Sequence, residues 1–381
     1  MKKIEVETLK RKIELKVKDP RRTEYGNIRH KLWEMIIIAL LSVICGGEDY
    51  EDMEIFGTER ESWLREEFGL ELEYGIPSKD TFRRLFERLN PKEFRSCLDE
   101  SIGYTRSLRE VVNVDGKAKK DAGIHIISAF VGENQITLGE IKSESKRGEI
   151  KEIPKLLEMI DVRGHIVTID SIGCQLAIAE KITQKKADYV IGLKKNQKNL
   201  YKATEAHFTQ GVRVFEKENT AEYAHGRMEI REYYLETDVS WLDAREEWTG
   251  LGSVGMVKSC VYRRVTNVNE VHVQSTPINN GKSTCATRYY ISSLTDIDEF
   301  AYAVREHWAI ENKLHWGLDV ILREDSDIAK KDNAPLNLNI LDKTALYLVS
   351  QVDLGKISRK HKRYKAALNP DVLLSMILCQ K

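Results

Sequence analysis

The chain contains 381 residues, of which 41% are hydrophobic and 31% are charged, with 60 basic and 60 acidic side chains. This composition supports a folded core, excludes overall disorder, and leaves length for two or three domains. The balanced charge excludes a wholly basic nucleic-acid coat. It permits local basic patches, such as KKNQKNLYK at 194–202 and RKHKRYK at 359–365, which are equally consistent with a solvated surface.

The cysteines and the apolar runs indicate the compartment in which the protein is expected. The six cysteines are scattered without a C-x-x-C pair, which predicts neither a disulfide framework nor a zinc ribbon and suits a reducing cytoplasm. The N-terminal segment has no apolar signal core. The most apolar run, MIIIALLSVICGG from Met35, is about half a membrane span and predicts a buried helix that ends at Gly46-Gly47. We therefore expect a cytoplasmic protein without membrane contact.

Residues 1–105 are expected to form a helical domain. An amphipathic segment at 50–69 follows the run from Leu32. Ser78 is placed to begin a helix, and Asn90-Pro91 ends that helix and starts another. Four basic side chains on this helix suit either DNA binding or surface solubility: Lys79, Arg83, Arg84 and Arg88.

Residues 106–196 change to short apolar or β-branched runs. Strands are predicted at Val111–Asp115, 125–132 and 135–142, with a hairpin turn at Gly132-Glu133-Asn134. A helix (EIPKLLEMI), a buried strand (HIVTID), a second helix (QLAIAEKITQKKA) and a strand (DYVIGLKK) follow. Three strands and then helix-strand-helix-strand is the order of a ribonuclease-H-like sheet, in which the first and fourth strands lie side by side.

The remaining chain is expected to complete this core around an insertion. Short strands (MEIREYYLET, SVGMVKSCVYRRV, EVHVQS) predict a β-rich insertion at 197–290. A long helix begins near Asp296 or Asp298, and a second follows the Ala334-Pro335 break; together they form a helical second part of the core at 291–350. Residues 351–381 are expected to be a basic C-terminal tail. The predicted fold class is therefore α/β, a ribonuclease-H-like core with an N-terminal helical domain and a β-rich insertion.

Two aspartates follow strands that this topology makes neighbours. Asp115 ends an apolar run before Gly116, and Asp170 ends HIVTID before Ser171. Each alone is typical of a cap or turn, but the carboxyl ends of adjacent strands form the usual crevice of an α/β sheet. Two carboxylates so close favour a cation between them, and Mg²⁺ suits such a site. Glu311 is the natural third ligand, delivered by a helix that packs on the sheet edge. Other acids nearby resemble the polar end of that helix: Asp319, Glu324, Asp325 and Asp327.

The stretch HWAIENKLHWGLD also allows other interpretations. On an α-helix, His307, Glu311 and His315 stack on one face because they are four residues apart. A zinc hydrolase motif has two histidines four apart with the glutamate as base, whereas these histidines are eight apart. We therefore favour a single ligand, Glu311, and a packing or hydrogen-bonding role for His315. The sequence contains no phosphate loop and no nucleophile elbow.

Several longer motifs resemble a known family. They are VDGK at 114–117, HIISAF at 125–130, TIDSIGCQ at 168–175, HGR at 225–227, RYYISS at 288–293 and HWAIENKLHWGLDV at 307–320. Together they resemble the insertion-sequence transposases of the DDE class, in particular the H-repeat-associated, ISAs-type group. DPRR and GIPSKDTFRRL extend this resemblance over nearly the whole chain.

The resemblance implies a site and a mechanism. It assigns the catalytic, metal-binding triad to Asp115, Asp170 and Glu311. Two Mg²⁺ ions, for which Mn²⁺ can substitute, activate water to cut DNA at the element end and then activate the freed 3′-OH to attack target DNA. The partners implied are terminal inverted repeats and target DNA, handled by a homodimer associated with the bacterial nucleoid.

The resemblance also assigns DNA contacts. Related transposases carry a Tyr-Arg-Glu-Lys signature, for which this chain has Val304, His307, Glu311 and Leu318, so His307 is expected to replace the arginine as a phosphate contact. The other DNA-binding residues implied are Lys117, Lys194, Asn196, Gln197, His225 and Arg227.

Two further hypotheses remain beside an active transposase. The segment AKKDAG after Lys117 is shorter than is usual in the family, which is compatible with a catalytically inactive, transposon-derived DNA-binding protein. Such a protein would bind the element ends without nicking them. The other hypothesis is a metal-dependent nuclease unrelated to transposition.

Overall fold

A computed structural model of the chain describes residues 2–21, 28–102, 106–119, 123–210, 216–224, 227–263, 283–324 and 329–377. These residues form a mixed α/β fold with a large sheet and many helices. The chain folds as two compact units. The first comprises Met1–Ser107, Gly116–Gly148 and Ala309–Lys381, and the second comprises Leu108–Asp115 and Glu149–Trp308.

The first unit is mainly helical. Its helices are α1 (Lys2–Lys16), α2 (Leu32–Cys45), α3 (Tyr50–Glu59), α4 (Glu61–Glu67), α5 (Lys79–Arg88), α6 (Pro91–Ile102), α11 (Ala334–Gln351), α12 (Arg359–Leu368) and α13 (Pro370–Ile377). The expected helix boundaries at Gly46, Ser78 and Pro91 are confirmed. Gly46 closes α2 with a φ of 118°, a left-handed conformation that glycine adopts without strain.

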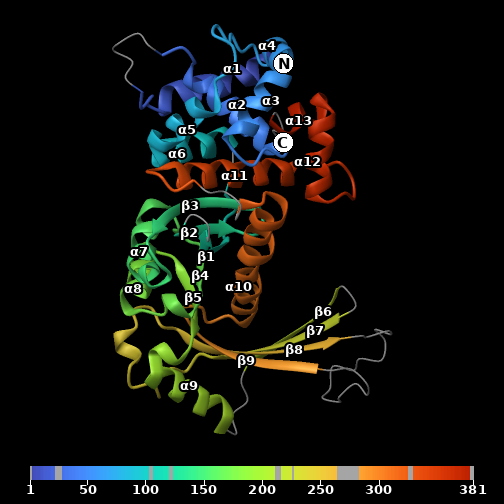
Figure 1. Cartoon of the computed structure of the whole chain (residues 1–381). Helices are drawn as coiled ribbons and strands as arrows, with labels where there is room; N and C mark the ends of the chain where they lie inside the picture. The colour runs from blue at the N-terminus through green and yellow to red at the C-terminus, as the bar shows by residue number, and fades with distance from the viewer. Residues whose placement is uncertain are drawn as a thin grey trace. The chain divides into compact units, whose positions relative to one another are not determined.

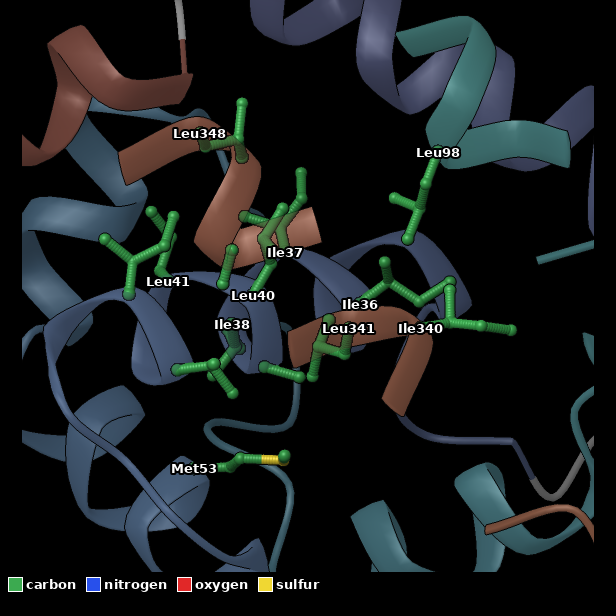
Figure 2. Packing of buried hydrophobic residues seen from close by; sticks show 14 of the residues in the cluster. Ile36, Ile37, Ile38, Leu40, Leu41, Met53, Leu98, Ile340, Leu341 and Leu348 are labelled. Atoms are coloured by element: carbon green, nitrogen blue, oxygen red, sulfur yellow. The ribbon is translucent and has the colours of Figure 1, made fainter. Parts of the chain in front are cut away.

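Helix α2 is the centre of the helical core. Its long apolar run is buried on all sides and packs against α11, which comes from the far end of the sequence. Figure 2 shows the two helices side by side with the side chains of Ile36, Ile37, Leu40, Ile340, Leu341 and Leu348 between and around them. The apolar run is thus the core of a helical layer.

The C-terminal segment differs from the expected basic tail. Residues 359–377 form α12 and α13, and Ala366, Leu373 and Leu374 are buried in the same core as α2. The apolar positions recur at helical spacing beneath the basic side chains, so the segment folds against the helical layer. The first unit also holds the hairpin of β2 (Ile124–Val131) and β3 (Ile136–Ser143), joined at the predicted turn.

The second unit contains a parallel ladder that continues into an antiparallel one. Strand β1 (Val111–Lys119) pairs in parallel with β4 (Ile166–Ile169), and β4 pairs in parallel with β5 (Asp188–Leu193), so the predicted adjacency of β1 and β4 is confirmed. Strand β1 continues to Lys119, so the expectation that it ends at Asp115 is wrong. The antiparallel strands follow β5 in the order β9 (Ser283–Ser292), β8 (Ser253–Arg263), β7 (Arg227–Glu236) and β6 (Glu216–Ala224).

The segment at 197–290 departs from its prediction in two ways. It begins with a helix, α9 (Lys198–Gln210), whose apolar positions Leu200 and Phe208 are buried. Cys260 and Cys285 lie opposite each other on β8 and β9 and form a disulfide, although their spacing of 25 residues gave no such indication. The predicted strand EVHVQS lies outside the described residues.

Helices cover both faces of the parallel ladder. Helices α7 (Glu149–Met159) and α8 (Leu176–Gln184) lie on one face, and α10 (Ile297–Ala309) lies on the other (Figure 1). Phe300, Ala303 and Val304 of α10 pack on Val111 and Ile166 of the ladder. In the described part of the chain, no helix combines the length and apolar character that a membrane span requires.

The helical stretch after α10 is not α-helical as predicted. The backbone widens into π-helical turns at η7 (Ile310–His315) and η8 (Gly317–Ile321). A π-helix bonds residue i to i+5, so the four-residue stacking expected of His307, Glu311 and His315 does not hold. The prediction of a uniform α-helix is therefore wrong: His307 lies in α10, whereas Glu311 and His315 lie in the π-helical segment η7.

Candidate active site

The parallel register brings two predicted site residues level with each other. The last paired residues of β1 and β4 are Val114 and Ile169, so Asp115 and Asp170 occupy the next step of the ladder. Neighbouring strands lie about 4.8 Å apart, so the backbones of the two aspartates come to the same end of adjacent strands. Both side chains are partly exposed, unlike the buried residues before them.

Strand alternation decides which face these aspartates occupy. Val111 and Ile166 pack against α10, and side chains two and four positions later point to the same face. Asp115 and Asp170 are each four positions later, so they lie on the α10 face. Between them and the apolar layer is a polar pair, Asn113 and Thr168, which are partners in the ladder.

That polar pair forms a chain of hydrogen bonds with α10. The hydroxyl of Thr168 donates to Oδ1 of Asn113 at 2.7 Å, and the Thr168 hydroxyl oxygen lies 2.9 Å from Nδ1 of His307. Because Thr168 has a single hydroxyl proton, Nδ1 of His307 is the donor in the second bond. Helix α10 is thereby fixed directly beside the strand that presents Asp170.

His307 is neutral in this position. Burial lowers its pKa to about 4, against a smaller opposite effect from the charge of Asp170. A neutral, buried imidazole bonded to Thr168 offers no positive charge to a phosphate. Nδ1 of His307 is thus occupied by Thr168, and the phosphate contact expected from the sequence stays a prediction.

Three hydrogen bonds hold the loop after Asp170. Oδ1 of Asp170 accepts from the backbone N–H of Ile172 at 2.9 Å. Nδ2 of Asn196 donates to the Ser171 carbonyl at 2.7 Å, and Nε2 of Gln197 donates to the Cys174 carbonyl at 2.8 Å. Asn196 and Gln197, expected to contact DNA, thus brace the loop that carries Asp170.

Strand β5 leaves room for this loop by means of a glycine. A Cβ on Gly192 would lie 3.1 Å from the backbone nitrogen of Ser171 and 3.5 Å from the carbonyl carbon of Asp170. The second distance is an ordinary van der Waals contact, but the first is tight enough that the loop backbone would have to move by a few tenths of an ångström. Gly192 therefore allows the close approach that positions Asp170.

Glu311 belongs to the first unit, in η7, and its side chain is exposed. His315, on the same segment, is neutral because burial lowers its pKa to about 3, assisted by the charges of Lys343 and Lys117. Among the residues that the structure describes, no three His, Cys, Asp or Glu side chains gather as a metal-binding group. Asp115 and Asp170 both belong to the second unit, and the triad stays a prediction.

Lys117 is engaged with carboxylates. Its Nζ lies 2.6 Å from Oδ1 of Asp319 and 2.9 Å from Oε2 of Glu324. Burial opposes the charge of Lys117, but Glu324 and Asp319 outweigh it and raise the pKa. Glu324 is fully buried, so its expected place at the polar end of a helix is wrong. Its charge is compensated by Lys117 and Lys119.

The remaining predicted DNA contacts are described only in part. Lys194 is exposed at the end of β5 and suits a phosphate contact. His225 lies outside the described residues, and Arg227 is described only as the first backbone position of β7.

Three residues of this site were missed from the sequence: Asn113, Thr168 and Gly192. A signal existed for the first two. In VVNVD and HIVTID, a polar residue interrupts an apolar run two positions before the aspartate, so each shares a strand face with that aspartate. Gly192 had no comparable signal, because its contact with the Asp170 loop depends on strand pairing.

Comparison with known proteins identifies the family. A family model described as "Transposase DDE domain" matches residues 105–348. The chain belongs to the DDE transposase family. A second model, described as "DDE_Tnp_1-associated", matches residues 15–100, so the helical segment that precedes the DDE transposase domain is also characteristic.

Curated relatives agree with this membership. "Putative transposase YncI" of Escherichia coli O157:H7 is 35% identical over 364 residues, covering 91% of this chain and 89% of the relative. "H repeat-associated putative transposase YhhI" of Escherichia coli K12 is 33% identical over 92% of this chain and 93% of its own length. A solved piggyBac transposase synaptic complex with hairpin DNA aligns with 98% of this chain and 77% of that chain, but with a TM-score of 0.40 and 11% identity. That likeness is too low to support an argument about this DDE transposase.

Proposed function

We propose that this DDE transposase is an active enzyme that cuts DNA at the ends of an insertion sequence and joins the freed ends to target DNA. The observation that supports the proposal is the parallel register of β1 and β4, in which Val114 pairs with Ile169, the residues that directly precede Asp115 and Asp170. Two adjacent carboxylates are unfavourable unless a cation lies between them. The pair therefore has the chemistry of a metal-dependent phosphodiester site.

The donor set fits Mg²⁺, with Mn²⁺ as a substitute. Mg²⁺ takes one or two carboxylate oxygens and completes its shell with water and phosphate oxygens. Asp115 and Asp170 supply the carboxylates, and Glu311 is our candidate for the third. When bound, a pair of such ions stabilises the attacking and leaving oxygens of an in-line displacement.

The protein's own residues prepare this site. His307 and Thr168 fix α10 to the strand beside Asp170, while Asn196 and Gln197 hold the following loop. Lys194 is placed to contact a DNA phosphate without reading sequence. These contacts keep the Asp170 carboxylate in place before DNA arrives.

The finer architecture is also part of the proposal. We interpret the parallel β1–β4–β5 ladder and the β2–β3 hairpin as a ribonuclease-H-like core. The boundaries at 105, 196, 290 and 350 remain predictions. The partners proposed are terminal inverted repeats and target DNA in the bacterial nucleoid, held by a homodimer because two ends must be processed together.

The test is end cleavage by Asp170→Asn. Purified protein is incubated with a duplex carrying the terminal inverted repeat, in Mg²⁺ or Mn²⁺, beside Asp243→Asn as a matched control. Asp243 is an exposed carboxylate of the same unit. We expect Asp170→Asn to cut at least about 100-fold more slowly, since loss of a direct ligand costs more than loss of its supporting contacts.

Other outcomes separate the alternatives. Wild-type rates in Asp170→Asn would refute the assigned site. Wild-type protein that binds the ends without nicking them would indicate a catalytically inactive DNA-binding descendant.

A further inference from the structure

Helix α12 carries its basic side chains on two sides, and the inner side is occupied. The buried guanidinium of Arg363 donates to the carbonyls of Val43 at 2.7 Å, Ile44 at 3.3 Å, and Ile321. Arg359 donates to the Lys313 carbonyl at 3.0 Å, and Lys362 donates to that of Val352. These bonds satisfy carbonyls at helix ends and fix the orientation of α12.

The outer side of α12 is exposed and has no acidic residue. The side chains that point outward are Lys360, His361, Tyr364, Lys365 and Leu368, of which Tyr364 is 63% exposed. They lie on one stripe because they are spaced at one, four, five and eight residues along the helix. Within the part of the chain that the structure describes, neither Lys360 nor Lys365 has an ion pair.

We infer that this outer stripe of α12 is a docking surface for the phosphate backbone of duplex DNA, an inference that rests on the proposed function for the choice of partner. Lys360 and Lys365 are separated by roughly 7.5 Å along the helix axis. At about 100° per residue the two side chains diverge by roughly 140° around the axis, so they flank the middle of the stripe. Tyr364 lies between them on the helix and offers a planar ring to a sugar.

The charge pattern favours nucleic acid over other anionic partners. The nearest acidic residues in sequence, Asp353 and Asp371, lie outside the helix, so the charged side chains of the stripe are all basic. A membrane surface would call for a wide apolar face, whereas Leu368 is the single aliphatic residue of the stripe. The surface is therefore suited to backbone contact without sequence reading.

The experiment measures DNA binding by the full chain in EDTA, where cleavage plays no part. Fluorescence anisotropy compares wild type, Lys360→Gln/Lys365→Gln, and the matched control Lys92→Gln/Lys151→Gln, which removes two exposed lysines from α6 and α7. Each variant is tested on an inverted-repeat duplex and a scrambled duplex over a range of salt concentrations. Circular dichroism melts verify that the variants are folded.

We expect the α12 variant to bind both duplexes about tenfold more weakly and to lower the salt slope by roughly 1.8, because each phosphate contact contributes about 0.9. The control should change neither quantity. Equal losses in the control, or wild-type affinity and slope in the α12 variant, would overturn the inference. Preferential binding of wild type to anionic phospholipid vesicles, lost in the α12 variant while DNA binding is kept, would also overturn it.

This design separates the two proposals. If Asp170→Asn still cuts DNA while the α12 variant binds weakly, the catalytic assignment fails and the docking surface stands. If wild type does not bind duplex DNA, both fail.

Discussion

At the residue scale, the position of Asp170 depends on neighbouring residues for which we propose no catalytic role. Its strand presents it beside Asp115, but Gly192, Asn196 and Gln197 determine where the loop after it lies. The family resemblance assigned Asn196 and Gln197 to DNA binding. The two interpretations make different predictions for a single substitution.

Asn196→Ala should weaken metal binding more than DNA binding. It removes the bond to the Ser171 carbonyl, worth about 1 kcal/mol, and frees the Asp170 loop. We expect Mn²⁺ affinity to fall about fivefold by calorimetry, since a loss of about 1.4 kcal/mol is tenfold. Asn199→Ala, on the exposed side of α9, serves as the control. A loss of DNA affinity in EDTA with unchanged Mn²⁺ affinity would favour the DNA-contact interpretation instead.

At the element scale, the first unit joins helices to its hairpin through a buried ionic network. Nζ of Lys343 on α11 donates to Ser128 Oγ on β2 at 2.7 Å and to Glu140 on β3, which also pairs with Arg95 on α6. Burial acts to raise the pKa of Glu140, but Arg95 and Lys343 together lower it. Burial lowers the pKa of Lys343, and the charge of Glu140 opposes that shift, so the mutual pairing of these buried groups is needed for stability.

Lys343→Met should be strongly destabilising. It leaves Glu140 buried with one cation in place of two, and we expect a loss of about 3–5 kcal/mol in the free energy of unfolding by urea denaturation. The matched control is Lys79→Met, which breaks a pair with Glu51 in which the two side chains are 53% and 59% exposed. Surface pairs contribute about 0–1 kcal/mol. Similar losses in the two variants would mean that the network has no special role.

At the scale of the whole molecule, the sequence predicted strand order better than helix geometry. Apolar runs and hairpin signals gave β1 to β5, α2, and the adjacency that pairs Asp115 with Asp170. Those features follow from local periodicity and from short-range turns.

The features that were missed depend on contacts distant in sequence. The π-helical turns at Ile310–His315 show no hydrophobic period that differs from an α-helix. The basic sequence of α12 predicts a tail. Its three inward basic side chains instead bond carbonyls of other elements, which the local sequence does not show. Gly192 is informative only beside the Asp170 loop.

The central claim is that Asp115 and Asp170 form one metal-binding pair. Its most direct test is a calorimetric titration of the full chain with Mn²⁺, comparing wild type with Asp115→Asn, Asp170→Asn and the double variant, and with Asp243→Asn as control. We predict that either single substitution removes the wild-type binding event and that the double variant loses nothing further, since each site needs both carboxylates. Wild-type Mn²⁺ binding by Asp115→Asn would contradict the account.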